Sequence, residues 1–150
     1  GRTEDHLAYL RDAPAFRNAL LYEQPKGDFA TTVVRLFLSA AYMTPWWRAA
    51  MALRDATLAA IAAKAEKEAT YHLRHAGEWV IRLGDGTPES RERVVAALDA
   101  LWRFTGELFH VEHAERALIE DGTLPDPAAI RAEWDATVSR VLSPATLERP

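Results

Sequence analysis

The sequence predicts an all-α fold, a bundle of antiparallel helices in a single domain that spans residues 1–150. Three observations carry this prediction. Apolar residues recur at three- and four-residue intervals through several long segments, which is the helical period. Short links rich in glycine and proline separate these segments. No segment shows the strict alternation of apolar and polar residues that a half-buried strand requires.

The longest predicted helix runs from Leu58 to Leu83, and the rest of the chain is organised around it. His72 lies inside its apolar stripe, about 35° from the centre of the stripe on a helical wheel, and Glu68 lies one turn earlier near the edge. A carboxylate and an imidazole on one inward face are side chains that bind metals in helical bundles. The stripe consists of Leu58, Ile61, Ala62, Ala65, Ala69, Leu73, Ala76, Trp79, Val80 and Leu83.

Two short helices are predicted at the N-terminal end. Thr3 can cap a helix through Leu10, and Asp12 can cap a second through Tyr22, because their oxygens accept hydrogen bonds from free N–H groups of the first turn. Pro14 is tolerated near the start of the second helix.

The next predicted helix, Phe29 to about Thr44, is apolar on nearly every side and must therefore be covered by neighbours all round. It follows the chain-breaking segment 24–27, and Asp28 is expected to cap it. Pro45 is expected to kink or end it, because an internal proline loses one backbone hydrogen bond and clashes with the preceding turn. Residues Trp46 to Leu53 then continue its direction or start a new segment.

Beyond the long helix, Gly84-Asp85-Gly86 is a predicted turn, with Gly84 just past the helix end. Thr87 is expected to cap a helix from Pro88 to about His110. The apolar stripe of this helix consists of Val94, Val95, Leu98, Leu101, Trp102, Thr105, Leu108 and Phe109.

The last part of the sequence predicts a short helix through Ile119 and a loop from Gly122 to Pro125. A final helix is expected from Asp126-Pro127 to about Leu142, where Ser143-Pro144 stops it.

The composition excludes several classes of protein. With 49% hydrophobic residues, 27% charged residues and a net charge of −4, the chain is expected to be soluble and globular, with no nucleic-acid partner. The absence of cysteine excludes disulfides and thiolate metal sites, and it is consistent with a cytoplasmic location.

No signal peptide is visible in the polar N-terminal segment. The apolar stretch from Phe29 to Leu53 is interrupted by Arg35 and Arg48, so it is too short to span a membrane, which needs ~20 residues.

The residues argue against a di-metal centre. Such a bundle needs an inward Glu on each of two helices and a Glu-x-x-His motif on each of two others. Ala69, not a glutamate, stands three residues before His72, and no acid occurs between Asp28 and Asp55. We therefore expect no metal site; Glu68 and His72 are vestigial candidates that should form a hydrogen-bonded pair at the edge of the core.

The one Glu-x-x-His motif, Glu107 to His110, points away from the apolar stripe of its helix, so we expect it to face solvent. The neighbouring cluster of His110, Glu112, His113 and Glu115 could bind an adventitious cation. Trp46 and Trp47 belong either to the core or to an interface, and the sequence leaves this open. No phosphate-binding loop or serine-nucleophile motif is present.

Several blocks of sequence resemble the PaaC subunits of bacterial phenylacetyl-CoA epoxidases, also called phenylacetate-CoA oxygenases. The similarity spans about Leu7 to Leu147, nearly the whole chain. It rests on EQPKGDFA at 23–30, AAKA at 62–65 with KEA at 67–69 and YHLR at 71–74, RLGDGT at 82–87 and LWRFTGELF at 101–109, with further matches at Asp12, Phe16, 18–21 and 146–147.

This resemblance implies a ferritin-like bundle. In that family the catalytic partner, PaaA, carries a di-iron centre and uses O2 to epoxidise the aromatic ring of phenylacetyl-CoA, with electrons from a reductase subunit. PaaC lacks a working metal site and supports PaaA. The resemblance therefore implies a non-catalytic structural subunit with no cofactor of its own, in a hetero-oligomer with a PaaA-like chain. Self-association stays open, and no membrane partner is expected.

Two departures from the family qualify this expectation. Family members begin with a further helical stretch before the position of Gly1 and continue past Pro150, so we expect the chain to be a fragment that lacks N-terminal helices of the bundle. The segment Tyr42–Trp47, with Pro45, also departs from the family pattern. Two alternatives remain: a catalytic di-metal carboxylate protein that uses Glu68 and His72, and a helical interaction module unrelated to oxygenases.

Overall fold

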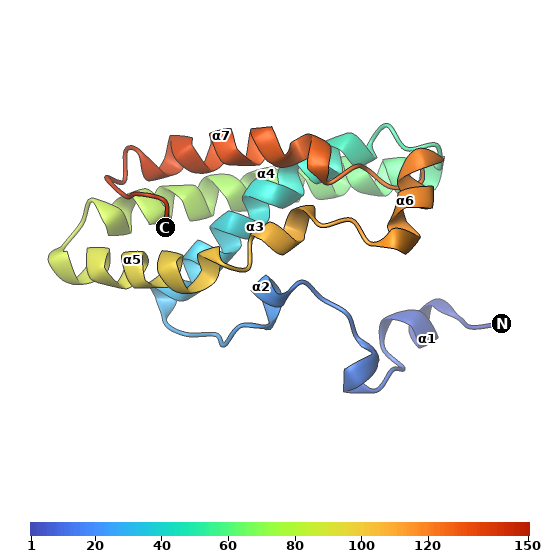
Figure 1. The fold of residues 1–150 in the computed structure, drawn as a ribbon, viewed down its shortest axis with the longest axis horizontal. Helices are drawn as coiled ribbons and strands as arrows, with labels where there is room; N and C mark the ends of the chain where they lie inside the picture. The colour runs from blue at the N-terminus through green and yellow to red at the C-terminus, as the bar shows by residue number, and fades with distance from the viewer.

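The structure is a computed structural model that describes all of residues 1–150, and it is entirely helical. Four helices form an antiparallel bundle: α3 (Phe29–Ala50), α4 (Ala56–Gly84), α5 (Pro88–Trp102) and α7 (Arg131–Leu142) (Figure 1). Shorter elements lie between and before them, namely α1 (Glu4–Ala8), α2 (Leu20–Glu23), α6 (His113–Glu120) and the 3-10 turns η1 (Ala13–Ala15), η2 (Gly106–Phe109) and η3 (Ala128–Ile130). The predicted all-α bundle is confirmed.

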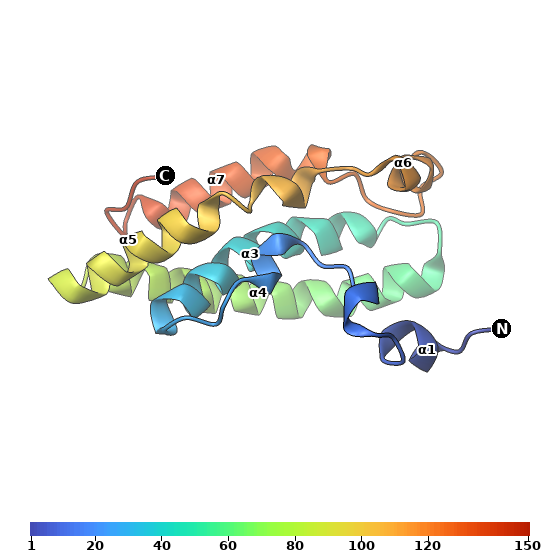
Figure 2. The ribbon, with the colours of Figure 1, turned by 60° about the horizontal axis from the view of Figure 1, so that its bottom comes forward.

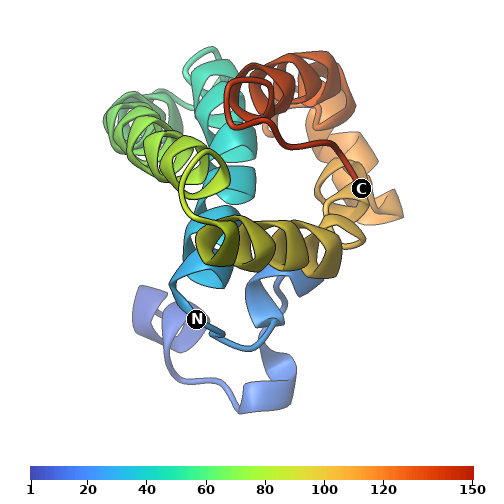
Figure 3. The same ribbon diagram turned by 90° about the vertical axis from the view of Figure 1, so that its left-hand side faces the viewer.

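Helix α3 is the central element of the bundle. It packs against α4, α5 and α7, and the view along the bundle places these three helices around it (Figure 3). Eleven of its 22 residues are buried, as its apolar pattern predicts. Asp28 caps its first turn, where the Asp28 carboxylate accepts a hydrogen bond from the Thr31 N–H at 2.9 Å.

Pro45 neither ends α3 nor starts a new segment, so the helix runs through it to Ala50. The missing N–H removes one backbone hydrogen bond, which disfavours a proline inside a helix. Here Tyr42, Thr44 and Pro45 itself are buried on the same helix, and Thr44 Oγ1 donates a hydrogen bond to the Ala40 carbonyl at 2.8 Å. Burial of this turn against the rest of the bundle therefore outweighs the lost bond.

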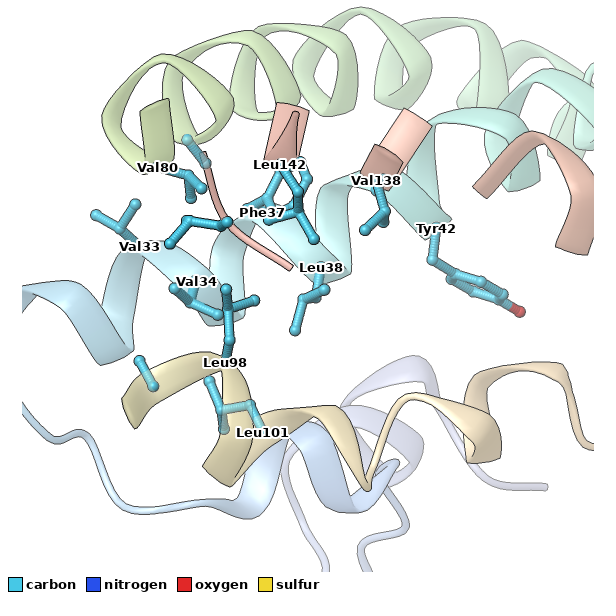
Figure 4. Packing of buried hydrophobic residues seen from close by; sticks show 14 of the residues in the cluster. Val33, Val34, Phe37, Leu38, Tyr42, Val80, Leu98, Leu101, Val138 and Leu142 are labelled. Carbon is cyan, nitrogen blue, oxygen red and sulfur yellow. The ribbon is translucent and has the colours of Figure 1, made fainter. Parts of the chain in front are cut away.

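The hydrophobic core lies where the four helices meet. Close up, Val34, Phe37 and Leu38 of α3 lie among side chains of the other three helices, including Val80, Leu98, Leu101, Val138 and Leu142 (Figure 4). Trp134 of α7 is fully buried, and its indole Nε1 donates a hydrogen bond to the Leu38 carbonyl at 3.1 Å. This bond satisfies the one polar atom of the largest core side chain and fixes α7 against α3.

Helix α4 begins two residues before the predicted start and ends one residue after the predicted end. Its buried residues are small or β-branched: Ala62, Ala69, Ala76, Gly77, Val80 and Gly84. Of the predicted stripe, Ala65, Leu73, Trp79 and Leu83 are half-buried, so most of the stripe faces the bundle as predicted. Its N-terminal end is the exception, since Leu58 is 40% exposed and Ile61 is 51% exposed.

The turn between α4 and α5 differs in detail from the prediction. Gly84 belongs to the helix instead of following it, and its backbone is not left-handed. Thr87 caps α5 as expected, since its hydroxyl accepts a hydrogen bond from the Ser90 N–H at 3.2 Å.

Helix α5 ends at Trp102 and not near His110. Thr105 Oγ1 donates a hydrogen bond to the Trp102 carbonyl at 2.8 Å. This bond competes with the backbone N–H that would donate to the same carbonyl if the α-helix continued. Gly106 follows, and glycine disfavours helix continuation because it loses more backbone freedom than other residues. The chain therefore changes to the 3-10 turn η2.

The N-terminal segment projects away from the bundle (Figures 1 and 2). Thr3 caps α1 as predicted, but α1 ends at Ala8. The predicted helix from Asp12 to Tyr22 is wrong, because only η1 and α2 form in that range. Residues 1–18 are all exposed. Short helices depend on burial of an apolar face, and this segment buries none before Leu21.

The C-terminal third follows the prediction closely. Helix α6 and the loop after it are confirmed, and α7 ends at Leu142, directly before Ser143-Pro144. The regular α-helix begins at Arg131, after the 3-10 turn η3, and not at Asp126-Pro127. None of the helices combines the length and the hydropathy that a membrane span requires.

Candidate functional site

Glu68 and His72 line a hollow of about 250 Å³ between α3 and α4, which we call the α3/α4 hollow. Both side chains lie at its open edge and are exposed. The buried row of Ala62, Ala69 and Ala76 explains this position. On a helical wheel His72 and Glu68 lie roughly 60° and 100° from Ala69, on the same side. The predicted stripe also included Ile61, which lies on the side of His72 and is exposed, so it placed His72 too far inward.

The expected hydrogen-bonded pair of Glu68 and His72 is wrong. Neighbouring residues on α4 form side-chain hydrogen bonds and ion pairs; Thr70 Oγ1, for example, donates to Glu66 Oε1 at 3.2 Å. Neither Glu68 nor His72 takes part in them. The ring of His72 contacts the ring of Tyr71, with 6.0 Å between centroids. Because both residues reach solvent, water can satisfy their polar atoms and no partner within the chain is needed.

These residues do not fit a di-iron centre. The chain brings no three His, Asp or Glu side chains together in an arrangement that could hold a metal ion. The α3 side of the hollow is formed by Leu36, Ser39, Ala40, Met43 and Trp47, none of which is a carboxylate. Ser39 Oγ is already hydrogen-bonded to the Tyr22 hydroxyl at 2.9 Å. One carboxylate and one imidazole supply too little negative charge and too few ligands for two irons.

Glu107 has a structural role that the sequence did not reveal. Its side chain is exposed, as expected, but its Oε2 accepts a hydrogen bond from the Leu20 N–H at 2.8 Å. Leu20 is the first residue of α2, whose first-turn N–H groups have no partner within the helix. The expectation that Glu107 faces solvent is confirmed, and the additional bond joins η2 to α2 across 87 residues of sequence.

The cluster of His110, Glu112, His113 and Glu115 does not converge on a single point. His110 Nε2 lies 3.4 Å from Glu112 Oε1, and both side chains are exposed. Glu115 Oε2 accepts a hydrogen bond from the Glu112 N–H at 2.8 Å and completes the capping box of α6. These side chains serve the start of α6, so the structure gives no support to a cation site there.

Trp46 and Trp47 are half-buried and pack edge to face, with 4.7 Å between ring centroids. They line a second and larger hollow, of about 370 Å³, which we call the aromatic hollow. The sequence left these residues between core and interface, and the structure places them on the wall of a cavity. The remaining lining residues are Ala19, Tyr22, Tyr42, Met43, Glu107, Leu108, His110, Glu115, Ile119, Leu124, Pro125 and Pro127.

The sequence did not predict the aromatic hollow, because its walls come from distant segments. Tyr22 lies on α2, Tyr42 on α3 and Ile119 on α6. Spacing within one helix cannot indicate that these three elements meet. The only local signal was the aromatic pair at 46 and 47.

Comparison with known proteins identifies the family. The model of the family described as phenylacetic acid catabolic protein, PaaA_PaaC, matches residues 1–150. The chain belongs to this family. The ferritin-like, all-α fold expected from the sequence is the fold of this family, and the resemblance stated from the sequence blocks is confirmed.

A curated relative supports the same assignment. The chain is 46% identical over 147 residues to the PaaC subunit of the 1,2-phenylacetyl-CoA epoxidase of Escherichia coli strain K12. The match covers 98% of this chain and 59% of the relative. The chain therefore spans about three fifths of the length of the curated relative that it matches.

Proposed function

We propose that the protein serves as a non-catalytic structural subunit of a multicomponent di-iron oxygenase that epoxidises the aromatic ring of phenylacetyl-CoA in phenylacetate catabolism. The observation that carries this proposal is the 46% identity to the PaaC subunit of an epoxidase over nearly the whole chain. In this proposal a homologous PaaA-like chain contains the di-iron centre, and the present chain pairs with it in the cytoplasm. The lack of cysteine supports a reducing compartment.

The side chains of the bundle support the non-catalytic role. Helix α3 forms the centre of the bundle and contributes no carboxylate to it. Glu68 and His72 lie at the solvent edge of the α3/α4 hollow without a third ligand. A chain built this way can contribute a folded surface to a complex while its partner supplies the metal chemistry.

Co-expression with the PaaA-like chain of the same source tests the pairing. We expect the two chains to co-purify at moderate salt, and we expect iron to follow the PaaA-like chain. Epoxidation of phenylacetyl-CoA should require the complex together with its reductase. Failure of the two chains to associate would favour the alternative of a helical interaction module unrelated to oxygenases.

Metal analysis of the separately purified chain tests the other alternative, a catalytic di-metal protein that uses Glu68 and His72. That alternative draws on the position of both residues at one hollow. It requires bound iron that the substitution His72→Ala removes. We expect no stoichiometric iron in either form. A bridged di-iron spectrum from the purified chain would overturn the proposed non-catalytic role.

A further inference from the structure

The aromatic hollow has the size and the walls of a small-molecule site. Its volume of about 370 Å³ falls within the range of roughly 300–1,000 Å³ that is common for ligand pockets. Nine of its 14 lining residues are hydrophobic. The indoles of Trp46 and Trp47 and the ring of Tyr22 give it aromatic walls, and aromatic rings pack favourably edge to face or offset against another ring.

Tyr42 places an unpartnered hydroxyl in this hollow. The residue is only 9% exposed, and its ring packs edge to face on Phe109 with 5.5 Å between centroids. The hydroxyl points away from the apolar cluster of the core (Figure 4). Burial raises the pKa of Tyr42 from its ordinary value of 10 to about 12. The phenol is neutral at physiological pH at either value, so it can donate a hydrogen bond.

The hydroxyl of Tyr42 differs from that of Tyr22 in the same hollow. Tyr22 is hydrogen-bonded to Ser39 Oγ at 2.9 Å, whereas Tyr42 has no such partner in the chain. Solvent in the hollow reaches this hydroxyl, since it is not among the fully buried polar atoms that lack a partner. A ligand that enters the hollow displaces this water and leaves the O–H unpaired unless the ligand carries an acceptor atom. The donor therefore favours a ligand with such an atom.

The charges around the hollow restrict the ligand further. No lysine or arginine lines it, and Glu107 and Glu115 lie at its rim, so an anion is disfavoured. Both carboxylates already accept a backbone N–H, from Leu20 and Glu112 respectively. An ammonium group only donates hydrogen bonds, so it would leave the O–H of Tyr42 without an acceptor.

We propose that the aromatic hollow binds an uncharged molecule with a single aromatic ring and a carbonyl or hydroxyl oxygen that accepts a hydrogen bond from Tyr42. The ring packs against the paired indoles of Trp46 and Trp47, and the oxygen faces the phenolic hydroxyl. This site adjoins the α3/α4 hollow, because Met43 and Trp47 line both, but neither Glu68 nor His72 lines the aromatic hollow. It does not depend on pairing with an oxygenase subunit.

Four compounds with similar rings and different end groups test the site. Phenylacetamide is neutral and carries an acceptor, phenylacetate is an anion, phenethylammonium is a cation, and ethylbenzene has no acceptor. Isothermal titration of the chain with each should rank phenylacetamide first, with the other three at least about tenfold weaker. The indole N–H signals of Trp46 and Trp47 should shift on binding in nitrogen-15 NMR spectra, while that of the buried Trp134 stays unchanged.

Two variants and a matched control locate the binding. Tyr42→Phe keeps the ring and removes the donor, so it should weaken phenylacetamide binding about five- to tenfold and leave ethylbenzene binding unchanged. Ala19→Phe should fill the hollow from the α2 side and abolish binding. Tyr71→Phe, at an exposed tyrosine of α4 outside the hollow, should have no effect.

Three results would overturn the proposal. One is the absence of saturable binding of phenylacetamide at millimolar concentration to the folded chain. Another is tightest binding of phenethylammonium, which would mean that the acidic rim and not Tyr42 selects the ligand. The third is an equal loss of affinity in Tyr42→Phe and Tyr71→Phe. Far-UV circular dichroism and melting of each variant establish that it is folded before the titration.

Discussion

At the scale of single residues, the absence of a side chain at Gly84 allows the C-terminal end of α4 to pack closely on the turn after α7. A Cβ at this position would lie 2.6 Å from the Ala145 carbonyl oxygen and 3.0 Å from Leu147 Cδ1. The first distance involves backbone, which cannot move aside as a flexible side chain can. The last turn of α4 therefore packs directly on the turn that follows α7.

The substitution Gly84→Ala should destabilise the chain by about 1–3 kcal/mol, because it overpacks this contact. Chemical denaturation followed by circular dichroism measures the change. Gly106→Ala is the matched control, since a Cβ there meets no atom within 4 Å. Equal stability of the Gly84→Ala protein and the unmodified chain would show that the turn at Ala145 moves freely.

His72 illustrates the opposite case, a residue whose position suggested function and whose contacts are few. It is exposed and contacts the ring of Tyr71. We expect His72→Leu to change the free energy of unfolding by less than about 0.5 kcal/mol, as surface substitutions generally do. Thermal melting at neutral pH measures this. A large loss would mean that the imidazole has a partner that this chain alone does not supply.

At the scale of elements, caps and helix ends are determined by short-range chemistry. Asp28 caps α3 through hydrogen bonds from the Thr31 backbone N–H and hydroxyl, both at 2.9 Å. These bonds, with a smaller contribution from Arg93, lower the pKa of Asp28 below its ordinary value of 3.8. The ionised form is thus favoured in the folded state, so the cap couples the stability of α3 to pH.

The sign of this coupling gives a testable prediction. A carboxyl group with a lowered pKa in the folded state stabilises the fold above its unfolded pKa, near 3.8, and loses that contribution as the pH falls through its folded pKa. Asp28→Asn keeps an acceptor for the cap and removes the charge. The melting temperature of the unmodified chain should exceed that of the variant at pH 6, and the difference should shrink below pH ~4. A constant difference across this range would contradict the assignment.

Element boundaries failed where tertiary contacts or local hydrogen bonds competed with pattern. Pro45 was expected to kink or end α3, with the residues after it continuing the helix or starting a new segment; burial of the surrounding turn keeps the helix continuous to Ala50. The expected helix from Pro88 to His110 stops at Trp102, where the Thr105 hydroxyl takes a carbonyl that the next turn would have used. The continuity of α3 at Pro45 can be predicted only when the packing of the bundle is known. The end of α5 at Trp102 had a local signal in the sequence, the Thr105-Gly106 pair.

At the scale of the whole molecule, arginines join the ends of the helices. Arg91 of α5 donates to the Gly84 carbonyl at 3.0 Å and to the hydroxyl and carbonyl oxygens of Thr146. Thr146 has a φ of 55°, a left-handed conformation that is unfavourable for a β-branched residue. At the other end of the bundle, Arg48 of α3 pairs with Glu133 of α7 at 2.7 Å and with Glu66 of α4 at 3.5 Å.

The substitution Arg91→Met should release the C-terminal turn, because it removes the charged donor that holds Thr146 and the end of α4 together. We expect a loss of about 1–3 kcal/mol and faster proteolytic cleavage after Leu142. Limited proteolysis with mass spectrometry measures the second effect. Arg103→Met, an exposed arginine near the end of the same helix, is the control and should behave like the unmodified chain.

The order of residues was enough to predict that the protein is all-helical, where Asp28, Thr87 and Ser143 begin and end helices, and that α3 must be covered on most sides. These features depend on hydrogen bonds and apolar periodicity within about one or two turns, which neighbouring residues supply. The matching blocks also indicated the family, which the comparison confirmed.

The packing of the helices was needed to establish that Glu68 and His72 reach solvent and that Tyr42 points into a hollow formed by α2, α3 and α6. Burial depends on which helices cover a face, and those helices are far apart in the sequence. A helical wheel gives the angle of a side chain but not the neighbour that it meets.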